Sequence, residues 1–236
     1  KWFYKQFDHI LLGSESFKEY AQKRVNLNKT LYFPNWADLV FESYKPTGKK
    51  NNPRKKIIIT YAGNIGEAQD LNSLVEAVEL TKKEHFELRL VGDGRFKKAL
   101  KSVVSSKKLN GLINFYDSVN SEELLSFFEE SDFLFLSLQN TPLFSKTVPA
   151  KLQTYLAVGK PIIASISGEA NQLLNAFQTG FQAEAGNRDQ LSAIFDKLDK
   201  VSQKDYNLFS ANCKELYQKK FHSSKRKEQL FALINE

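Results

Sequence analysis

From residue 57 onward, segments with the pattern of strands alternate with segments that have the pattern of helices. The first strand opens with three consecutive isoleucines, and a continuous apolar run is typical of a strand that helices cover on both faces. A helical crossover between two strands makes them parallel neighbours in one sheet. The pattern predicts an α/β fold, a doubly wound, Rossmann-like parallel sheet with strands at 57–61, 87–91, 112–116, 133–137 and 161–165. The expected helices are 71–84, 95–107, 121–130, 150–158, 169–176, 188–201, 204–221 and 224–234, with an extended piece at 180–183.

The residues before this alternation are too few for a domain of their own. They predict a strand at 8–13, a helix at 14–25 with Phe17, Tyr20 and Ala21 facing inward, and a second strand at 31–33. Residues 35–56 combine prolines and a glycine with dense lysines, which is the composition of a linker. We therefore expect the following domains: 1–34 as the end of a preceding domain, 35–56 as a basic linker, 57–203 as the α/β domain and 204–236 as terminal helices.

The positive charge of the chain is concentrated in the expected linker. The net charge is +7, and six basic residues without an acid lie between Lys45 and Lys56. A local basic linker argues against a nucleic-acid partner, and it leaves peripheral contact with an anionic membrane surface open. The longest apolar run, 133–136, is too short to span a bilayer.

The cysteine and methionine content bounds the compartment and the completeness of the chain. Cys213 is the only cysteine, so an internal disulfide and the metal motifs built on paired cysteines are excluded. We expect a cytoplasmic protein, with the inner face of the plasma membrane as the alternative location. The chain starts at Lys1 and contains no methionine, which suggests a piece of a longer protein.

Four loops follow the predicted strands, at 63–66, 92–94, 117–119 and 139–149. The carboxyl ends of parallel strands lie at one edge of the sheet, which is where α/β proteins bind ligands. Glycines in the first two loops permit close approach of a phosphate to the backbone. A dinucleotide site fits poorly, because the third glycine of that fingerprint is missing and no acid ends the next strand.

The stretch 146–169 adds a second phosphate signal. Thr147, Val148 and Ala150 lie at or just before the start of the predicted helix 150–158, where unpaired N–H groups and the positive end of the helix dipole can receive an anion. Lys146 and Lys151 lie beside them. A diphosphate suits this place, although an ordinary α/β helix with two solvated lysines explains the same pattern. The scattered histidines and the lack of an Asp-x-Asp motif predict neither a Ser/His/Asp site nor a metal site, and we expect no cofactor.

Taken together, the loops resemble the C-terminal half of a B-fold glycosyltransferase of the group-one family. The motifs Tyr61-Ala-Gly-Asn-Ile-Gly, Leu90-Val-Gly-Asp-Gly, Val148-Pro-Ala-Lys-Leu and Gly159-Lys-Pro-Ile-Ile-Ala are similar to those of bacterial capsule and O-antigen enzymes such as N-acetylfucosamine transferases. The resemblance implies a nucleotide diphosphate sugar donor, expected to be a UDP-amino-sugar, and a saccharide or lipid-linked acceptor bound by the missing half. It also implies that residues 1–33 end the acceptor domain, that helix 224–234 crosses back to that domain, and that the fragment alone does not turn over.

The resemblance transfers unevenly to the binding residues. Where the family's glycine loop commonly has an Arg and a Lys that touch the diphosphate, this chain has Asn64 and Gln69; where the family often has two glutamates, it has Lys146 and Thr154. Lys146 could supply the absent charge, the backbone of Val119 would meet the base, and Glu169 could replace the lost ribose carboxylate. The predicted nucleotide-sugar-binding residues are Gly63, Asn64, Ile65, Gly66, Gly92, Val119, Lys146, Thr147, Val148, Ala150, Lys151, Thr154 and Glu169. No catalytic residue is assigned.

Two alternatives stay open. The lost cations at Asn64 and Gln69 and the lost carboxylate at Thr154 are compatible with a non-catalytic module or partner subunit that keeps the fold. A nucleotide-sugar epimerase of the same two-domain architecture is a third interpretation.

Overall fold

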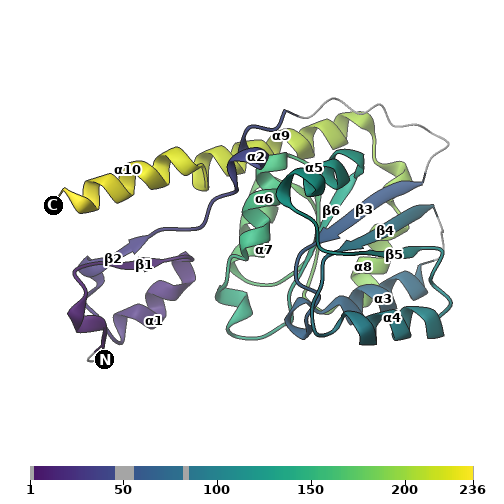
Figure 1. Ribbon diagram of the computed structural model, residues 1–236, viewed down its shortest axis with the longest axis horizontal. Coiled ribbons are helices and arrows are strands. Elements are labelled where there is room, and N and C mark those ends of the chain that lie inside the picture. Colours follow the sequence, from purple (N-terminus) through teal and green to yellow (C-terminus); the bar gives the residue numbers. More distant parts are fainter. Residues whose placement is uncertain (1–2, 46–55, 82–84, 236) are drawn as a thin grey trace.

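The computed structural model describes residues 3–45, 56–81 and 85–235. Its main feature is a six-stranded sheet of order β5-β4-β3-β6-β7-β8 in which every neighbouring pair is parallel (Figure 1). The reversal of strand order between β3 and β6 confirms the doubly wound topology. The strands are β3 (Ile57–Ala62), β4 (Phe86–Val91), β5 (Ile113–Tyr116), β6 (Phe133–Ser137), β7 (Ile162–Ser165) and β8 (Gly180–Ala183).

Helices cover both faces of this sheet. One apolar core lies between the sheet and α3 (Leu71–Leu80), α4 (Lys97–Ser106) and α8 (Arg188–Phe195). The other lies under α5 (Ser121–Glu130), α6 (Ala150–Val158), α7 (Glu169–Phe177) and α9 (Gln203–Lys220). Successive strand residues point to opposite faces, so Ile59 and Tyr61 belong to the first core and Ala62 to the second. This explains why residues on both faces of β3 are buried.

The N-terminal unit, residues 3–33, contains a two-stranded parallel sheet of β1 (Ile10–Leu12) and β2 (Thr30–Tyr32). The helix predicted at 14–25 is shorter: a 3-10 turn at Glu15–Phe17 precedes α1 (Lys18–Gln22). Ala21 is buried as predicted, but Tyr20 is 48% exposed because no further layer of the described residues covers that side of α1.

Part of the segment predicted as a linker is packed structure. Residues 35–45 include α2 (Leu39–Glu42), and the side chains of Ala37 and Phe41 are buried in the core under α6. The linker prediction for 35–56 depended mainly on the prolines, the glycine and the lysines of 45–56. Of these, residues 46–55 lie outside the described part of the chain. The linker role of residues 46–55 therefore stays a prediction.

The chain ends in two consecutive helices, α9 and α10 (Ser223–Ile234). The helix predicted at 188–201 ends instead at Phe195, because Leu198 turns back into the core through a 3-10 turn. α10 extends on the side of the N-terminal unit (Figure 1), and the charge of Arg226 acts on Tyr32 of β2. The far end of α10 exposes Leu230, Phe231 and Ile234, so the predicted crossing of its full length stays a prediction.

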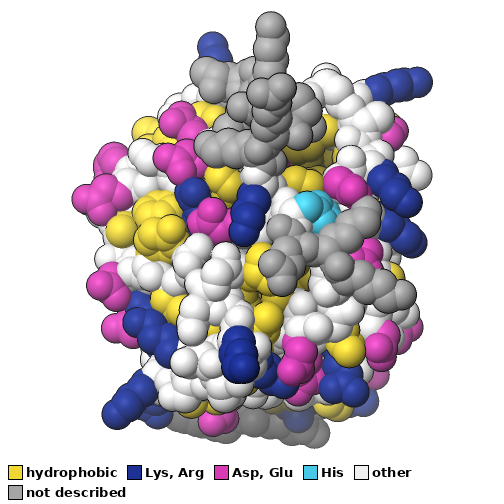
Figure 2. Space-filling model, turned by 90° about the vertical axis from the view of Figure 1, so that its right-hand side faces the viewer, with side chains coloured by type: hydrophobic (Ala, Val, Ile, Leu, Met, Phe, Trp, Pro, Cys, Tyr) yellow, Lys and Arg dark blue, Asp and Glu magenta, His cyan; other side chains and the backbone are white. Residues whose placement is uncertain are grey.

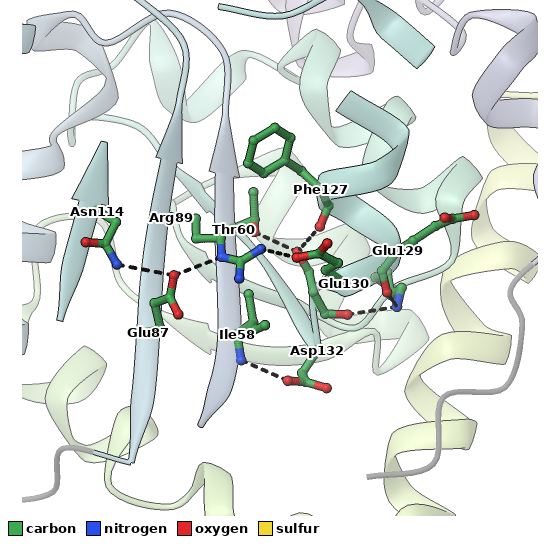
Figure 3. Close-up of polar contacts among 11 residues, drawn as sticks. Ile58, Thr60, Glu87, Arg89, Asn114, Phe127, Glu129, Glu130 and Asp132 are labelled. Atoms are coloured by element: carbon green, nitrogen blue, oxygen red, sulfur yellow. Dashed lines mark hydrogen bonds and ion pairs between the residues drawn. The ribbon is translucent and has the colours of Figure 1, made fainter. Parts of the chain in front are cut away.

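A polar network fastens the end of α5 to the sheet, away from the carboxyl ends of the strands (Figure 3). Arg89 of β4 is paired with Glu87 at 2.9 Å and with Glu130 at 2.5 Å. Asp132 accepts the N–H of Ile58 at 2.8 Å, which gives this residue the structural role of holding β3 beside β6. The network stabilises the sheet and leaves its other edge available for ligands.

The surface seen from the amino ends of the strands has no uniform sign. Figure 2 shows Lys and Arg side chains interspersed with Asp and Glu side chains on its visible, described part. Among the described residues, no helix combines the length and apolarity required to cross a bilayer.

Candidate functional site

The loops after β3 and β4 are packed backbone against backbone. The N–H of Gly63 donates to the carbonyl of Val91 at 2.9 Å. Gly63 and Gly92 have φ angles of 129° and 142°, which residues with a Cβ rarely adopt. A Cβ at Gly92 would lie 2.0 Å from the carbonyl oxygen of Gly63. Because Gly92 has no side chain, the loop after β3 can pack directly against the loop after β4.

The residues that replace the family's loop cations close the loop on itself. The Nδ2 of Asn64 donates to the Oε1 of Gln69 at 3.1 Å, and the N–H of Gly66 donates to the same oxygen at 3.0 Å. Asn64 and Gly66 thus contact the side chain of Gln69, and their contact with a ligand stays a prediction. Ile65 does not: its side chain is fully buried and its backbone N–H and carbonyl are bonded to Asp93 and Phe96. Ile65 is part of the core, and its prediction as a ligand contact is wrong.

Lys151 supplies a cation at this loop from the opposite side. It lies in the first turn of α6, and its Nζ would be 3.4 Å from a Cβ at Gly63. The same Nζ donates to the hydroxyl of Tyr61 at 2.6 Å and lies 3.9 Å from the centre of that ring. Burial without a carboxylate partner lowers the pKa of Lys151 from 10.5 to about 7. An anion that arrives at Gly63 would favour the charged form.

The start of α6 offers fewer free amides than the sequence suggested. The N–H of Thr147 donates to the carbonyl of Phe144, and that of Val148 donates to the hydroxyl of Ser14 at 2.9 Å. These two residues are therefore not donors to a ligand in this arrangement. The N–H groups of Ala150 and Lys151 have no acceptor within the described part of the chain, as expected for the first turn of a helix.

The N-terminal unit occupies two more of the predicted ligands. The carboxylate of Glu169 accepts the N–H of Glu15 at 2.9 Å and that of Ser16 at 2.7 Å. The Nζ of Lys146 is paired with Glu19 of α1 at 2.6 Å. Because both oxygens of Glu169 hold the 3-10 turn, the proposed ribose role of Glu169 is corrected to one of joining the N-terminal unit to α7.

For the other two predicted residues, Val119 and Thr154, the described part of the chain shows no side-chain hydrogen bond. Val119 follows β5 with its side chain packed on the core, and the role of its backbone toward a base stays a prediction. Thr154 is half-buried in the second turn of α6, on a helix whose other face lies in the core.

Lys97 is a residue of this edge that sequence reasoning did not find. The residue is only 7% exposed, and its Nζ donates to the carbonyl of Gly92 at 2.7 Å, the carbonyl of Tyr116 at 2.9 Å and the Oδ1 of Asp117 at 2.8 Å. The hydrogen bond from Lys97 lowers the pKa of Asp117. One buried ammonium thus ties together the loops after β4 and β5. In the sequence it is one of two adjacent lysines at the start of a helix, and nothing distinguishes it.

Among residues 3–45, 56–81 and 85–235, no group of three or more His, Cys, Asp or Glu side chains is arranged to hold a metal ion. Among the described residues, the positive charge next to Gly63 comes from Lys151 and the first amides of α6, while Lys146 is paired with Glu19. These groups suit an anionic ligand, and their position beside two glycine loops suits one that lies against the backbone.

Comparison with known proteins agrees with this geometry. The putative colanic acid biosynthesis glycosyl transferase WcaI of Escherichia coli K12 is 28% identical over 180 residues, which are 72% of this chain and 44% of the relative. The amylovoran biosynthesis glycosyltransferase AmsK of Erwinia amylovora is 25% identical over 59% of this chain and 35% of its own length. The chain therefore spans less than half the length of these two curated relatives.

Solved structures show the same fold. Anabaena Alr3699/HepE, crystallised with UDP and glucose, superposes on 97% of this chain and 63% of its own with a TM-score of 0.78 and 14% identity. Sucrose-phosphate synthase of Thermosynechococcus elongatus gives a TM-score of 0.76 at 17% identity over 97% of this chain and 58% of its own. The architecture is that of the donor half of B-fold glycosyltransferases.

The family profile described as "Glycosyl transferases group 1" matches residues 45–215, well over half of the chain and all of the loops at the carboxyl edge of the sheet. With the sheet order, the glycine loops and the cationic start of α6 in place, the chain belongs to the group 1 glycosyl transferases.

Proposed function

We propose that this chain binds a UDP-sugar, with a UDP-amino-sugar as the expected donor, at the carboxyl edge of its sheet. It would serve as the donor half of a glycosyltransferase that builds a surface polysaccharide. The observation that carries the proposal is the position of the Lys151 ammonium, which lies against the bare backbone of Gly63 at the start of α6. A diphosphate beside them would meet a cation, two helix amides and the bare backbone of Gly63.

These groups also suit the chemistry of sugar transfer. When the bond between the sugar and the diphosphate breaks, negative charge builds up on the leaving diphosphate. Fixed donors aimed at that charge stabilise the transition state more than the ground state. In this chain the amides of Ala150 and Lys151 and the Lys151 ammonium lie where they can do so.

The acceptor belongs to the part of the protein that this chain does not span. The curated relatives act in colanic acid and amylovoran biosynthesis, and this chain covers 44% and 35% of them. We infer that a saccharide or lipid-linked acceptor is held by an additional half, and that the 236-residue chain binds donor without turnover.

Calorimetry with UDP tests this proposal. The wild-type chain should bind UDP, and Gly63→Val should lose binding, because φ near 129° strains a branched residue and its side chain would occupy the ligand's approach beside Lys151. Gly111→Val is a matched control: Gly111 has open space around its Cβ position and no positive φ. Binding that survives Gly63→Val, or a silent wild-type titration at millimolar UDP, would contradict the proposal.

A non-catalytic module is the second candidate, and one observation favours it. Asn64 and Gln69 bond each other instead of presenting charge, and Lys146 is paired with Glu19. A module of this kind would keep the fold without the cations of an active donor site. The silent titration described above is its expected result.

A further inference from the structure

Tyr61 connects the glycine loop and Lys151 through one hydroxyl. It is the penultimate residue of β3, it is fully buried, and its Oη donates to the carbonyl of Asn64 at 2.5 Å. The same oxygen accepts a hydrogen bond from the Nζ of Lys151 at 2.6 Å, while the ammonium lies over the ring. A single phenol thus fixes the turn after β3 and the cation of α6 at the same time.

The direction of these hydrogen bonds, from Lys151 to Tyr61 and from Tyr61 to Asn64, follows from the protonation state of Tyr61. Burial raises the pKa of Tyr61 above its ordinary value of 10.0, so the hydroxyl keeps its proton. That one proton is given to Asn64, and Tyr61 can only accept from Lys151. The ammonium has three N–H groups, and Tyr61 is its one hydrogen-bond partner among the described residues. The others remain available on the side of Gly63.

We propose that Tyr61 is a positioning residue for the donor diphosphate, holding the Lys151 ammonium against Gly63 so that its remaining N–H groups are directed at the phosphates. This inference rests on the proposed function, since it needs a diphosphate at that edge. Lys151 is the residue that touches the ligand, and Tyr61 acts through it. The ring adds a cation–π contact that keeps the ammonium from moving out into water.

The arrangement also links donor binding to a proton. The titratable group that Lys151 faces is Tyr61 on β3, which in turn interacts with Tyr155 on α6, and Lys151 is ion-paired with no carboxylate of the described residues. With burial holding the pKa of Lys151 at about 7, most of this side chain is neutral at pH 8. A bound diphosphate favours the charged form, so binding at pH 8 should take up close to one proton and weaken as pH rises.

Calorimetry of UDP at pH 7.5, 8 and 8.5, in buffers of different ionisation enthalpy, measures both affinity and proton uptake. The phosphates of free UDP titrate near pH 6 and do not contribute in this range. Tyr61→Phe removes only the hydroxyl, and we expect UDP affinity to fall about fivefold to tenfold. Uridine, which lacks the diphosphate, should bind both proteins equally in ligand-observed NMR.

Two further variants separate positioning from folding. Tyr155→Phe also loses a buried hydroxyl, one bonded to the backbone of Ala62, but it does not touch Lys151 and should leave UDP affinity and proton uptake unchanged. Lys151→Arg keeps a cation that does not titrate, so it should retain UDP binding and lose the proton uptake.

The outcomes distinguish this inference from the function on which it rests. A wild-type chain that binds no UDP overturns the proposed function itself. Wild-type binding with Tyr61→Phe unchanged, or with UDP and uridine weakened by the same factor, overturns the role of Tyr61 alone. Proton uptake that persists in Lys151→Arg would place the titrating group elsewhere.

Discussion

Glu42 joins three parts of the fold that are far apart in the sequence. One of its carboxylate oxygens accepts the hydroxyl of Tyr217 at 2.5 Å and the N–H of Ser223 at 2.8 Å, and the other accepts the Ser223 hydroxyl at 2.7 Å. Tyr217 in turn accepts the N–H of Ala37 at 3.0 Å. The carboxylate therefore connects α2 with the end of α9 and the first residue of α10.

Substitutions of Glu42 should lower the free energy of unfolding, and the loss should be larger when more of its hydrogen bonds are removed. Three bonds to a charged acceptor would give about 4.5 kcal/mol if each contributed about 1.5 kcal/mol, but Glu42 is partly exposed and water replaces part of the loss. We expect Glu42→Leu to lower the free energy of unfolding by about 2 to 3 kcal/mol. Glu42→Gln keeps the shape and one acceptor oxygen, and the Ser223 hydroxyl can turn to accept from the new amide NH2, so its loss should be about 1 kcal/mol.

Urea unfolding followed by circular dichroism measures these differences. With a slope of about 2 kcal/mol per molar, the Glu42→Leu midpoint should fall by roughly 1 M. Glu228→Gln, on the exposed face of α10, is the control and should shift the midpoint by less than about 0.3 M. A Glu42→Leu midpoint equal to that of Glu228→Gln would refute the account of Glu42 as the connecting group.

The contribution of Glu42 to the free energy of unfolding should depend on pH. Burial alone would raise the pKa of Glu42, but hydrogen bonds from Tyr217 and Ser223 outweigh it and hold the pKa below the ordinary 4.5. A carboxyl whose folded pKa is depressed stabilises the protein above its unfolded pKa and loses that contribution as pH falls. The difference between wild type and Glu42→Gln should therefore be full above pH 4.5 and shrink below it.

Two other changes test the site. Lys97→Met removes the ammonium that ties Gly92 to the loop after β5, so UDP and uridine should weaken by the same factor, and the free energy of unfolding should fall by about 2 to 4 kcal/mol; a loss confined to UDP would move Lys97 to the phosphate end. Glu169→Gln should raise hydrogen exchange at the amides of Glu15 and Ser16 about tenfold and leave UDP affinity unchanged. Reduced UDP affinity with unchanged exchange would restore the ribose role of Glu169.

The fold of the large domain could be predicted because its signals are local. The apolar run 57–59 reports only on neighbouring residues, and the structure confirms the strand that it marks. Asn120, which caps α5, and Gly159, which ends α6 in the left-handed conformation, are local features of the same kind. The short N-terminal unit was predicted less well. Its helix depends on which layer covers Tyr20, and the sequence of α1 does not contain that information.

At the candidate site, too, the sequence predicted the residues whose position follows from local structure and missed one whose position depends on residues far along the chain. The sequence placed Gly63, Gly92, Ala150 and Lys151 at one edge, because a glycine loop after a strand and the start of a helix have fixed positions in a parallel sheet. It missed Lys97, whose importance comes only from three acceptors that the fold brings around it.

Distance along the chain explains why Lys146, Val148 and Glu169 were assigned to the ligand. Their partners Glu19, Ser14 and Glu15 lie 127, 134 and 154 residues away, and a loop pattern does not tell whether a carboxylate or amide is reserved for a ligand or for another part of the same protein. Both uses need the same chemistry, a polar group at the carboxyl edge of the sheet. In this chain the edge is shared: residues at 63 and 150–151 lie where we propose that the diphosphate binds, while Lys146, Val148 and Glu169 hold the N-terminal unit against the edge. The loop 146–150 belongs to both groups, so the geometry of its donor-facing end depends on how the N-terminal unit is seated.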